Sequence, residues 1–188
     1  MPEVVAANPG AAVQGIGTLL YDLLPHTDFP PLAVRGVTVE LEGMHLTYRV
    51  DGGERLVLPA PDLPYRTDGL WRTTCFELFL MAGEGPAYVE FNFSPSSQWA
   101  AYAFSGYRDG MAPLARTIPP ATERREDGIT VHCDLSGLPN GELRMGLTAV
   151  IEEEGGVKSF WALAHGPGAP DFHDAACFAA TLPAPKAT

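Results

Sequence analysis

The strict alternation of apolar and polar side chains in short segments limits the fold of this chain most strongly. Residues 88–93, YVEFNF, place three apolar side chains on one side of an extended chain and Tyr88, Glu90 and Asn92 on the other, because successive side chains of a β-strand point to opposite faces. Comparable segments recur from Val34 onward, each bounded by Gly, Pro, Asn or Asp, which favour turns. About ten strands with little helix are therefore predicted, as an antiparallel two-sheet β-sandwich of immunoglobulin-like or jelly-roll type.

The expected strands follow one another along the chain. They are predicted at residues 34–43, 44–50, 54–59, 70–81, 128–135, 142–153, 157–163 and 177–182, with two more between residues 88 and 108. Residues 17–26, GTLLYDLLPH, fit either a short helix or an extended lead-in. Arg124 and Arg125 are flanked by glutamates and are interpreted as a solvated turn.

Length and composition suit one folded domain. With 188 residues, of which 46% are hydrophobic, the chain is long enough to bury a two-layer core. Residues 1–16 are small and unpatterned, and they are predicted to form a loose N-terminal segment. The single domain is therefore assigned to residues 17–188.

Charge and cysteine content argue against several classes of partner. A net charge of −11 at pH 7 disfavours nucleic acid and anionic membranes, which recruit basic patches. Cys75, Cys133 and Cys177 have no Cys-x-x-Cys spacing and are predicted to be reduced and buried. The N-terminal sequence lacks the pattern of a signal peptide, and no apolar run is long enough to span a membrane, so a cytoplasmic location is expected.

Alternation also assigns the inward faces of the strands. One contiguous core is predicted from Phe76, Leu78, Leu80, Val89, Phe91, Phe93, Leu143, Met145 and Leu147. Glu77, Glu90 and Asn92 then fall on the opposite side of strands that follow each other in sequence. Because consecutive strands usually lie side by side, these polar groups are expected to share one sheet face.

Three segments resemble the bacterial DOMON-like proteins, which are related to the family 9 carbohydrate-binding modules. The segments are LWRTTCFELFL at 70–80, YVEFNFSPSSQWAAYAFSGYR at 88–108 and FWALAHGPGAPDFHDAACF at 160–178. The resemblance extends over residues 26–182 and implies a sandwich that binds a sugar or a haem without catalysing a reaction. In the sugar-binding relatives, two tryptophans clamp a sugar ring while carboxylate, amide and arginine groups bind its hydroxyls.

The resemblance also implies which residues bind the ligand. Trp71 and Glu77 match the tryptophan and the acid around the corresponding strand, Trp161 matches the second tryptophan, and Asn92 and Arg108 are further matches. The clamp requires both indoles to line one concave region with Glu77 close by. The alternative for each tryptophan is simple packing in the core.

Three roles are open for Glu77 and Glu90 on the sequence alone. They bind sugar hydroxyls, they pair with arginines across the sheet, or they act as an acid–base pair on a glycosidic bond. Such catalysis needs two carboxyl groups at a defined separation with different pKa values. Nothing in the sequence fixes that separation.

Two cofactors are alternatives to a saccharide. His165, Asp171 and His173 carry side chains that bind a divalent metal, although Asp and His also brace turns. Haem needs a His or Met that faces a large apolar pocket, and no Cys-x-x-Cys-His attachment motif is present. The side chains formally available for haem ligation are His45, Met81, Met111 and His132.

The sequence thus predicts a non-catalytic module that binds a small, saccharide-like ligand on one sheet face without a cofactor. One alternative is a haem-binding electron-transfer module. The others are a hydrolase that uses Glu77 and Glu90, and a structural or interaction domain with no small ligand.

Overall fold

The structure, a computed structural model, is built almost entirely from β-strands and their connections. It describes residues 18–43, 45–115, 118–135, 138 and 141–182, so the predicted loose segment 1–16 lies outside the described residues. Three 3-10 helices of three residues each occur in connections: η1 (Gly53–Arg55), η2 (Leu70–Arg72) and η3 (Ala175–Cys177). Across the described ranges, no helix has the length and apolar character needed to cross a membrane.

Twelve strands are present in the described residues. They are β1 (Leu19–Pro25), β2 (Gly36–Glu42), β3 (His45–Asp51), β4 (Cys75–Ala82), β5 (Tyr88–Phe93), β6 (Trp99–Phe104), β7 (Ala112–Pro113), β8 (Ala121–Arg125), β9 (Gly128–His132), β10 (Leu143–Glu153), β11 (Val157–Ala162) and β12 (Ala180–Leu182). The prediction of an all-β chain with little helix is confirmed.

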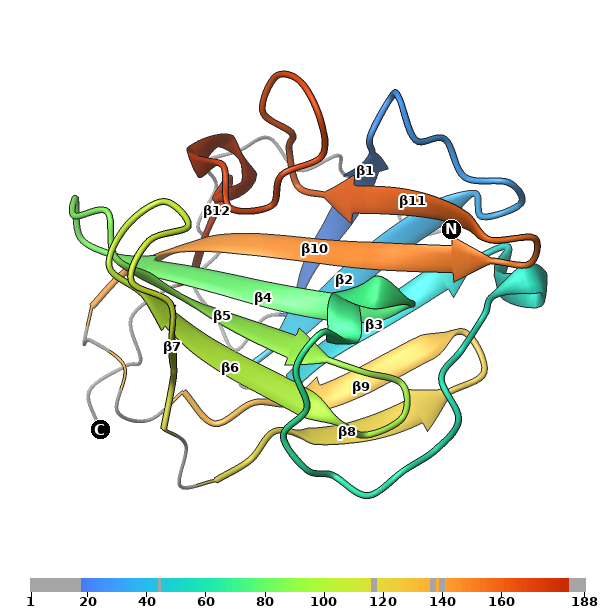
Figure 1. Cartoon of the computed structure of the whole chain (residues 1–188), viewed down its shortest axis with the longest axis horizontal. Helices are drawn as coiled ribbons and strands as arrows, with labels where there is room; N and C mark the ends of the chain where they lie inside the picture. The colour runs from blue at the N-terminus through green and yellow to red at the C-terminus, as the bar shows by residue number, and fades with distance from the viewer. Residues whose placement is uncertain (1–17, 44, 116–117, 136–137, 139–140, 183–188) are drawn as a thin grey trace.

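All of these strands belong to one antiparallel sheet, so the prediction of a two-sheet sandwich is wrong. The strand order is β7-β6-β5-β4-β10-β11-β1-β2-β3-β9-β8, and β12 pairs with β10. The join is β1, in which Leu19–Leu23 pair with β2 while Leu24 and Pro25 pair with β11. Alternation within a strand predicts its faces but not its partners, and the partners β1 and β11 lie far apart in the sequence. The sheet curls so that β2 and β3 lie behind β4 and β10 (Figure 1).

The curl encloses the main hydrophobic core. Inward side chains of β2, β3 and β9, such as Val39, Tyr48 and Ile129, pack with the inward side chains of β4, β5 and β10. All nine predicted core residues belong to this cluster, eight of them buried and Val89 partly buried. The core prediction is therefore confirmed, although the two halves around it are parts of one sheet.

Three local expectations have different outcomes. The strand predicted at residues 54–59 is not formed, because Gly52, at φ 82°, turns the chain into η1, and Leu56 makes an isolated bridge to Glu153. Arg124 and Arg125 belong to β8 and pair with β9, so the interpretation as a turn is wrong. The undecided segment around residues 17–26 is extended and forms β1.

The outer face of β4, β5, β6 and β10 is also covered. The covering segment, residues 163–178, runs from the end of β11 through η3 across this face, and its Phe172 and Phe178 join a second hydrophobic cluster with Phe79 and Tyr88. Figure 1 shows this segment at the red end of the colour scale, above β10. Glu77, Glu90, Asn92 and Thr148 on the outer face of these strands are therefore buried rather than solvated, whereas Arg144 remains exposed.

The three cysteines are buried, and none of them forms a disulfide bond. Cys133 belongs to the main core, whereas Cys75 and Cys177 belong to the cluster on the outer face.

Candidate ligand-binding site

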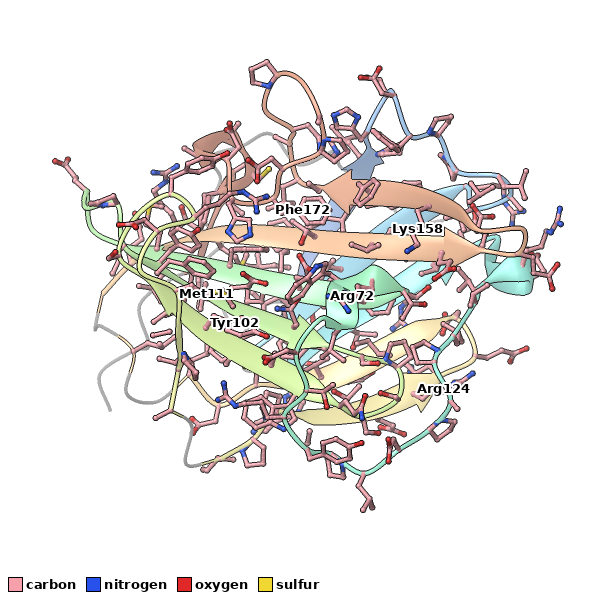
Figure 2. The ribbon with its side chains drawn as sticks, in the orientation of Figure 1. Arg72, Tyr102, Met111, Arg124, Lys158 and Phe172 are labelled. Atoms are coloured by element: carbon pink, nitrogen blue, oxygen red, sulfur yellow. The ribbon has the colours of Figure 1, made fainter. Side chains whose placement is uncertain are left out.

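A cavity of about 350 Å³ opens on the outer face of the sheet, beneath the covering segment. Its lining combines aromatic rings with ionisable groups: Trp71, Glu77, Glu90, Tyr102, Phe104, Arg108, Met111, Val150, Phe160, Pro170, Phe172 and His173. Tyr102, Met111 and Phe172, labelled in Figure 2, come from β6, the connection after β6 and the covering segment. The volume lies at the lower end of the range for small-molecule sites.

Glu77 belongs to β4 and presents its carboxyl group to the cavity from the sheet. It is 3% exposed, and Thr148 on β10 donates a hydrogen bond from Oγ1 to Glu77 Oε2 at 3.0 Å. Burial and the nearby charge of Glu90 raise the pKa of Glu77 well above its ordinary value, and the Thr148 hydrogen bond opposes this rise only in part. Glu77 therefore holds a proton more readily than a surface glutamate does.

Glu90 lies on the adjacent strand β5 and is 5% exposed. Asn92 donates a hydrogen bond from Nδ2 to Glu90 Oε1 at 2.6 Å, and the thiol of Cys75 points to Asn92 Oδ1 at 3.7 Å. Burial raises the pKa of Glu90, while the Asn92 hydrogen bond and the charge of Arg108 act against that rise. In the strand register Glu77 pairs with Asn92, so the two glutamates are diagonal neighbours on one face.

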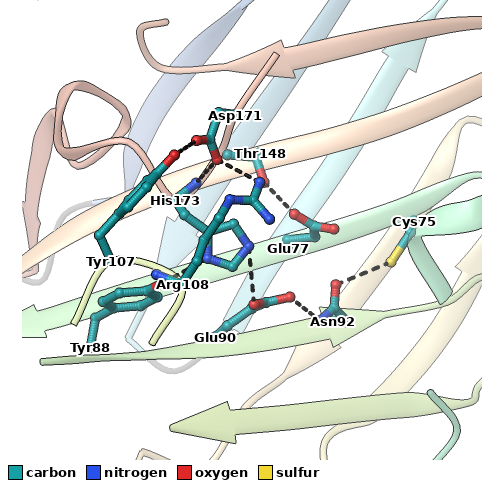
Figure 3. Close-up of polar contacts among 10 residues, drawn as sticks. All are labelled: Cys75, Glu77, Tyr88, Glu90, Asn92, Tyr107, Arg108, Thr148, Asp171 and His173. Atoms are coloured by element: carbon teal, nitrogen blue, oxygen red, sulfur yellow. Dashed lines mark hydrogen bonds and ion pairs between the residues drawn. The ribbon is translucent and has the colours of Figure 1, made fainter. Parts of the chain in front are cut away.

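His173 reaches the site from the covering segment (Figure 3). Its Nδ1 lies 2.7 Å from the Tyr88 hydroxyl, and its Nε2 lies 3.8 Å from Glu90 Oε2. The Tyr88 oxygen also accepts the backbone N–H of Arg108 at 3.2 Å. The Tyr88 hydroxyl and the His173 ring both have suitable hydrogen-bond partners when Tyr88 donates to Nδ1 and the imidazole proton is on Nε2, facing Glu90. Burial, together with the charge of Arg108, lowers the pKa of His173 to about 4, so the ring is neutral at pH 7.

Arg108 and Asp171 tie the connection after β6 to the covering segment. Arg108 has φ 51°, in the left-handed region, where a non-glycine residue costs about 1–3 kcal/mol. Its guanidinium donates to Asp171 Oδ1 at 2.7 Å, and the Tyr107 hydroxyl also donates to Asp171. Asp171 in turn accepts the backbone N–H of His173 at 3.0 Å. The strained turn is thus held in place by contacts that also orient the imidazole (Figure 3).

Five aromatic side chains provide much of the remaining lining: Trp71, Tyr102, Phe104, Phe160 and Phe172. The Tyr102 hydroxyl donates to Asp68 Oδ1 at 2.6 Å, which fixes its ring. Trp71 meets Tyr102 edge to face, with ring centroids 6.4 Å apart, and remains 41% exposed. An exposed indole beside buried rings offers a surface on which a ligand ring can pack.

Comparisons with known proteins place the fold but not the family. No protein-family model matches the sequence, and no curated protein matches it. A crystal structure of a candidate carbohydrate-binding protein from Bacteroides uniformis is similar, with a TM-score of 0.58 and 14% sequence identity over 89% of this chain and 86% of that chain. At this identity the likeness shows a shared fold alone. The resemblance to DOMON-like proteins and family 9 modules stays a prediction.

The predicted tryptophan clamp is not formed. Trp161 is 2% exposed, packs in the main core and donates from Nε1 to Ser159 Oγ at 2.9 Å. Side chains alternate along β11, so it is the neighbouring Phe160 that lines the cavity. Trp71 and Trp161 therefore lie on opposite faces of the sheet, and the prediction that both line one concave region is wrong.

The other predicted ligand-binding residues come together. Glu77, Glu90 and Arg108 line the cavity with Trp71, whereas Asn92 is fully buried and holds Glu90 in place. No arginine of the described ranges forms an ion pair with either glutamate. Arg108, which also lines the cavity, pairs with Asp171 instead. A binding role for these residues stays a prediction.

The predicted metal ligands do not converge. His165 donates from Nε2 to Leu24 O at 2.9 Å and packs against His26, whereas Asp171 accepts the backbone N–H of His173, which lines the cavity. Within the part of the chain that the structure describes, no three His, Cys, Asp or Glu side chains are grouped so as to hold a metal ion.

The four candidates for haem ligation are dispersed. His45 and His132 lie on the exposed side of β3 and β9, with ring centroids 4.6 Å apart. Met81 belongs to the outer hydrophobic cluster, and Met111 lines the cavity.

Sequence reasoning missed most of the aromatic lining. In WAAYAF, the outward positions of Tyr102 and Phe104 follow from the same alternation that placed Glu90, so a signal for them was present. Phe172 comes from an irregular segment, in which no periodicity indicates the direction of a side chain.

Proposed function

We propose that this protein is a non-catalytic binding module whose cavity takes one small, polyhydroxylated, saccharide-like ligand. The observation that carries the proposal is the lining of the cavity, which combines two buried carboxyl groups, a guanidinium and an imidazole with five aromatic rings. Sugar recognition needs both kinds of group, because ring C–H faces pack on aromatic rings while hydroxyls need buried hydrogen-bond partners.

The polar groups are arranged before any ligand arrives. Glu90 is oriented by Asn92, and His173 is oriented by Tyr88 and Asp171. A carboxylate or imidazole whose rotamer is already fixed loses little further entropy on binding, so more of its hydrogen-bond energy contributes to affinity.

The fold similarity supports the same class of ligand. The neighbour from Bacteroides uniformis is itself a candidate carbohydrate-binding protein, and the two chains align over most of their lengths. Carbohydrate binding by this chain is inferred from that protein as part of the proposal.

Isothermal titration calorimetry with a panel of neutral and charged mono- and disaccharides tests the proposal. The expected result is one-site binding by at least one sugar and a loss of about tenfold or more in affinity in Trp71→Ala, because an exposed ring at a site contributes about 1–2 kcal/mol of packing. Trp161→Phe is the matched control, since Trp161 lies on the opposite face. NMR spectra of the recovered sugar should show it unchanged.

Three outcomes would contradict the proposal. Equal affinity of the wild type and Trp71→Ala, or binding by no sugar of the panel, removes the saccharide site. Cleavage of a glycosidic bond in the recovered ligand would instead assign Glu77 and Glu90 an acid–base role.

A further inference from the structure

Among the residues that the structure describes, no charged cationic group pairs with the two carboxyl groups in the cavity. Glu77 and Glu90 project from adjacent strands onto one face, and each accepts one hydrogen bond from a neutral side chain, Thr148 or Asn92. Among the described residues, the nearest basic contact to either carboxyl group is His173 Nε2, 3.8 Å from Glu90, and His173 is neutral at pH 7. The negative charge is therefore left for a proton or a ligand to neutralise.

Arg108 does not fill this role. Its guanidinium is bound to Asp171 at 2.7 Å, and the Tyr107 hydroxyl donates to the same carboxylate. Its charge still acts on Glu90 through space. An anionic ligand would have to displace Asp171 from Arg108 and approach two glutamates, so the site disfavours anionic sugars.

The rest of the lining suits a cation. The five aromatic side chains of the cavity offer π-faces, which attract an ammonium group more strongly when it is desolvated. The net charge of −11 at pH 7 also draws cations toward the molecule.

We propose that the ligand of this cavity carries a protonated amine, as an amino sugar does, and that the ammonium group binds between Glu77 and Glu90. The proposal rests on the saccharide-like function proposed above and narrows it. Burial raises the pKa of both carboxyl groups, and the charge of Glu90 raises the pKa of Glu77 further, so the free site holds a proton more readily than exposed glutamates do, and the ammonium group displaces it. Binding is then linked to proton release into solvent.

The coupling between ligand binding and proton release depends on all the ionisable groups that face Glu77 and Glu90, from each strand and segment packed around them. These groups are Cys75 on β4, Tyr88 on β5, Tyr102 on β6, Arg108 after β6, and Asp171 and His173 on the covering segment. Burial and the hydrogen bond to Asp68 raise the pKa of Tyr102, and burial raises the pKa of Tyr88 and of the Cys75 thiol. Arg108 stays charged and His173 stays neutral between pH 5 and pH 7, so a pH-dependent preference for the amine in this range is assigned to the two glutamates.

Calorimetric titration with glucosamine, N-acetylglucosamine, glucose and cyclohexylamine tests the proposal. At pH 7, glucosamine should bind at least tenfold more tightly than glucose or N-acetylglucosamine, and this preference should shrink at pH 5. Titrations in two buffers of different ionisation enthalpy should show release of protons with glucosamine. Glu77→Gln/Glu90→Gln should reduce the preference to near onefold, whereas Glu84→Gln, on the exposed β4–β5 turn, should retain it.

The outcomes separate this inference from the proposed function. Equal affinities for glucosamine and glucose, or a preference that survives in the double variant, would overturn the amine site and leave sugar binding in place. Binding of cyclohexylamine without any sugar would retain the amine site and overturn the saccharide class. Binding of none of the four compounds would overturn both. Thermal unfolding of the double variant checks that it folds.

Discussion

The two faces of the curled sheet bury carboxyl groups in opposite ways. Glu153, which ends the inward-facing series of β10, is fully buried and accepts backbone N–H groups from Leu32, Ala33 and Val34 at 2.6, 2.7 and 3.2 Å. Glu77 and Glu90 on the outer face each accept one hydrogen bond from a side chain and also line a cavity.

This difference separates a structural acid from candidate functional ones. A carboxylate whose lone pairs are filled by the backbone anchors a loop and has no capacity left for a ligand. Carboxyl groups that are buried with few partners, beside a cavity, cost stability that selection for folding alone would remove. Burial of a carboxyl group by itself therefore says little about its role, and the number of its hydrogen-bond partners identifies the outer face as the one with the candidate site.

The largest expected effect on the free energy of unfolding comes from removing one phenylalanine ring from each face of the sheet. Phe91→Ala opens a void in the main core and should lower the free energy of unfolding by about 3–5 kcal/mol. Phe172→Ala should cost only about 1–2 kcal/mol, because Phe172 already borders a cavity that water can fill. Urea denaturation of both variants measures the difference.

A similar cost for both variants would break the comparison, since it would mean that the outer face is packed as densely as the core. Phe91→Leu serves as a control that keeps the site apolar and should cost less than Phe91→Ala.

The second prediction concerns Glu153, the buried glutamate that accepts three backbone hydrogen bonds. Glu153→Ala leaves three buried backbone donors without their acceptor and should cost on the order of 3 kcal/mol, because each unsatisfied group carries a penalty of about 1–3 kcal/mol that the loop can partly relieve by moving. Glu153→Gln keeps an acceptor oxygen of the same shape and should cost roughly half as much. Hydrogen exchange of the Leu32, Ala33 and Val34 amides should accelerate in Glu153→Ala, and unchanged exchange there would remove the anchoring role.

Alternation in the sequence was sufficient to place the inward core and the outward glutamates, because both depend on side-chain direction within single strands. It could not predict the single curled sheet, since that depends on β1 changing partner from β2 to β11 between Leu23 and Leu24. The family resemblance, in contrast, misassigned Trp161, because it matched residue type and position, whereas Trp161 pairs with the inward-facing Ala149 and so points into the core. Phe172 and His173 reach the site from an irregular segment, so their place depends on tertiary contacts such as the Arg108–Asp171 ion pair.

The smallest expected effect on stability concerns Glu77, one of the two cavity glutamates that each accept a single hydrogen bond. Because the pKa of Glu77 is raised from 4.5, the folded protein binds more protons than the unfolded chain above about pH 4.5, and stability falls as pH rises toward the raised pKa. Each pKa unit of that difference corresponds to about 1.4 kcal/mol. Glu77→Gln cannot ionise, so it should match the wild type near pH 4 and exceed its stability by about 1 kcal/mol or more at pH 8. Urea denaturation from pH 4 to pH 8 measures this, with Glu84→Gln reporting the effect of removing one exposed charge. A Glu77→Gln variant that is less stable than the wild type at pH 8 would mean that the Glu77 carboxylate is stabilised in the folded protein, and the contrast between the two faces would disappear.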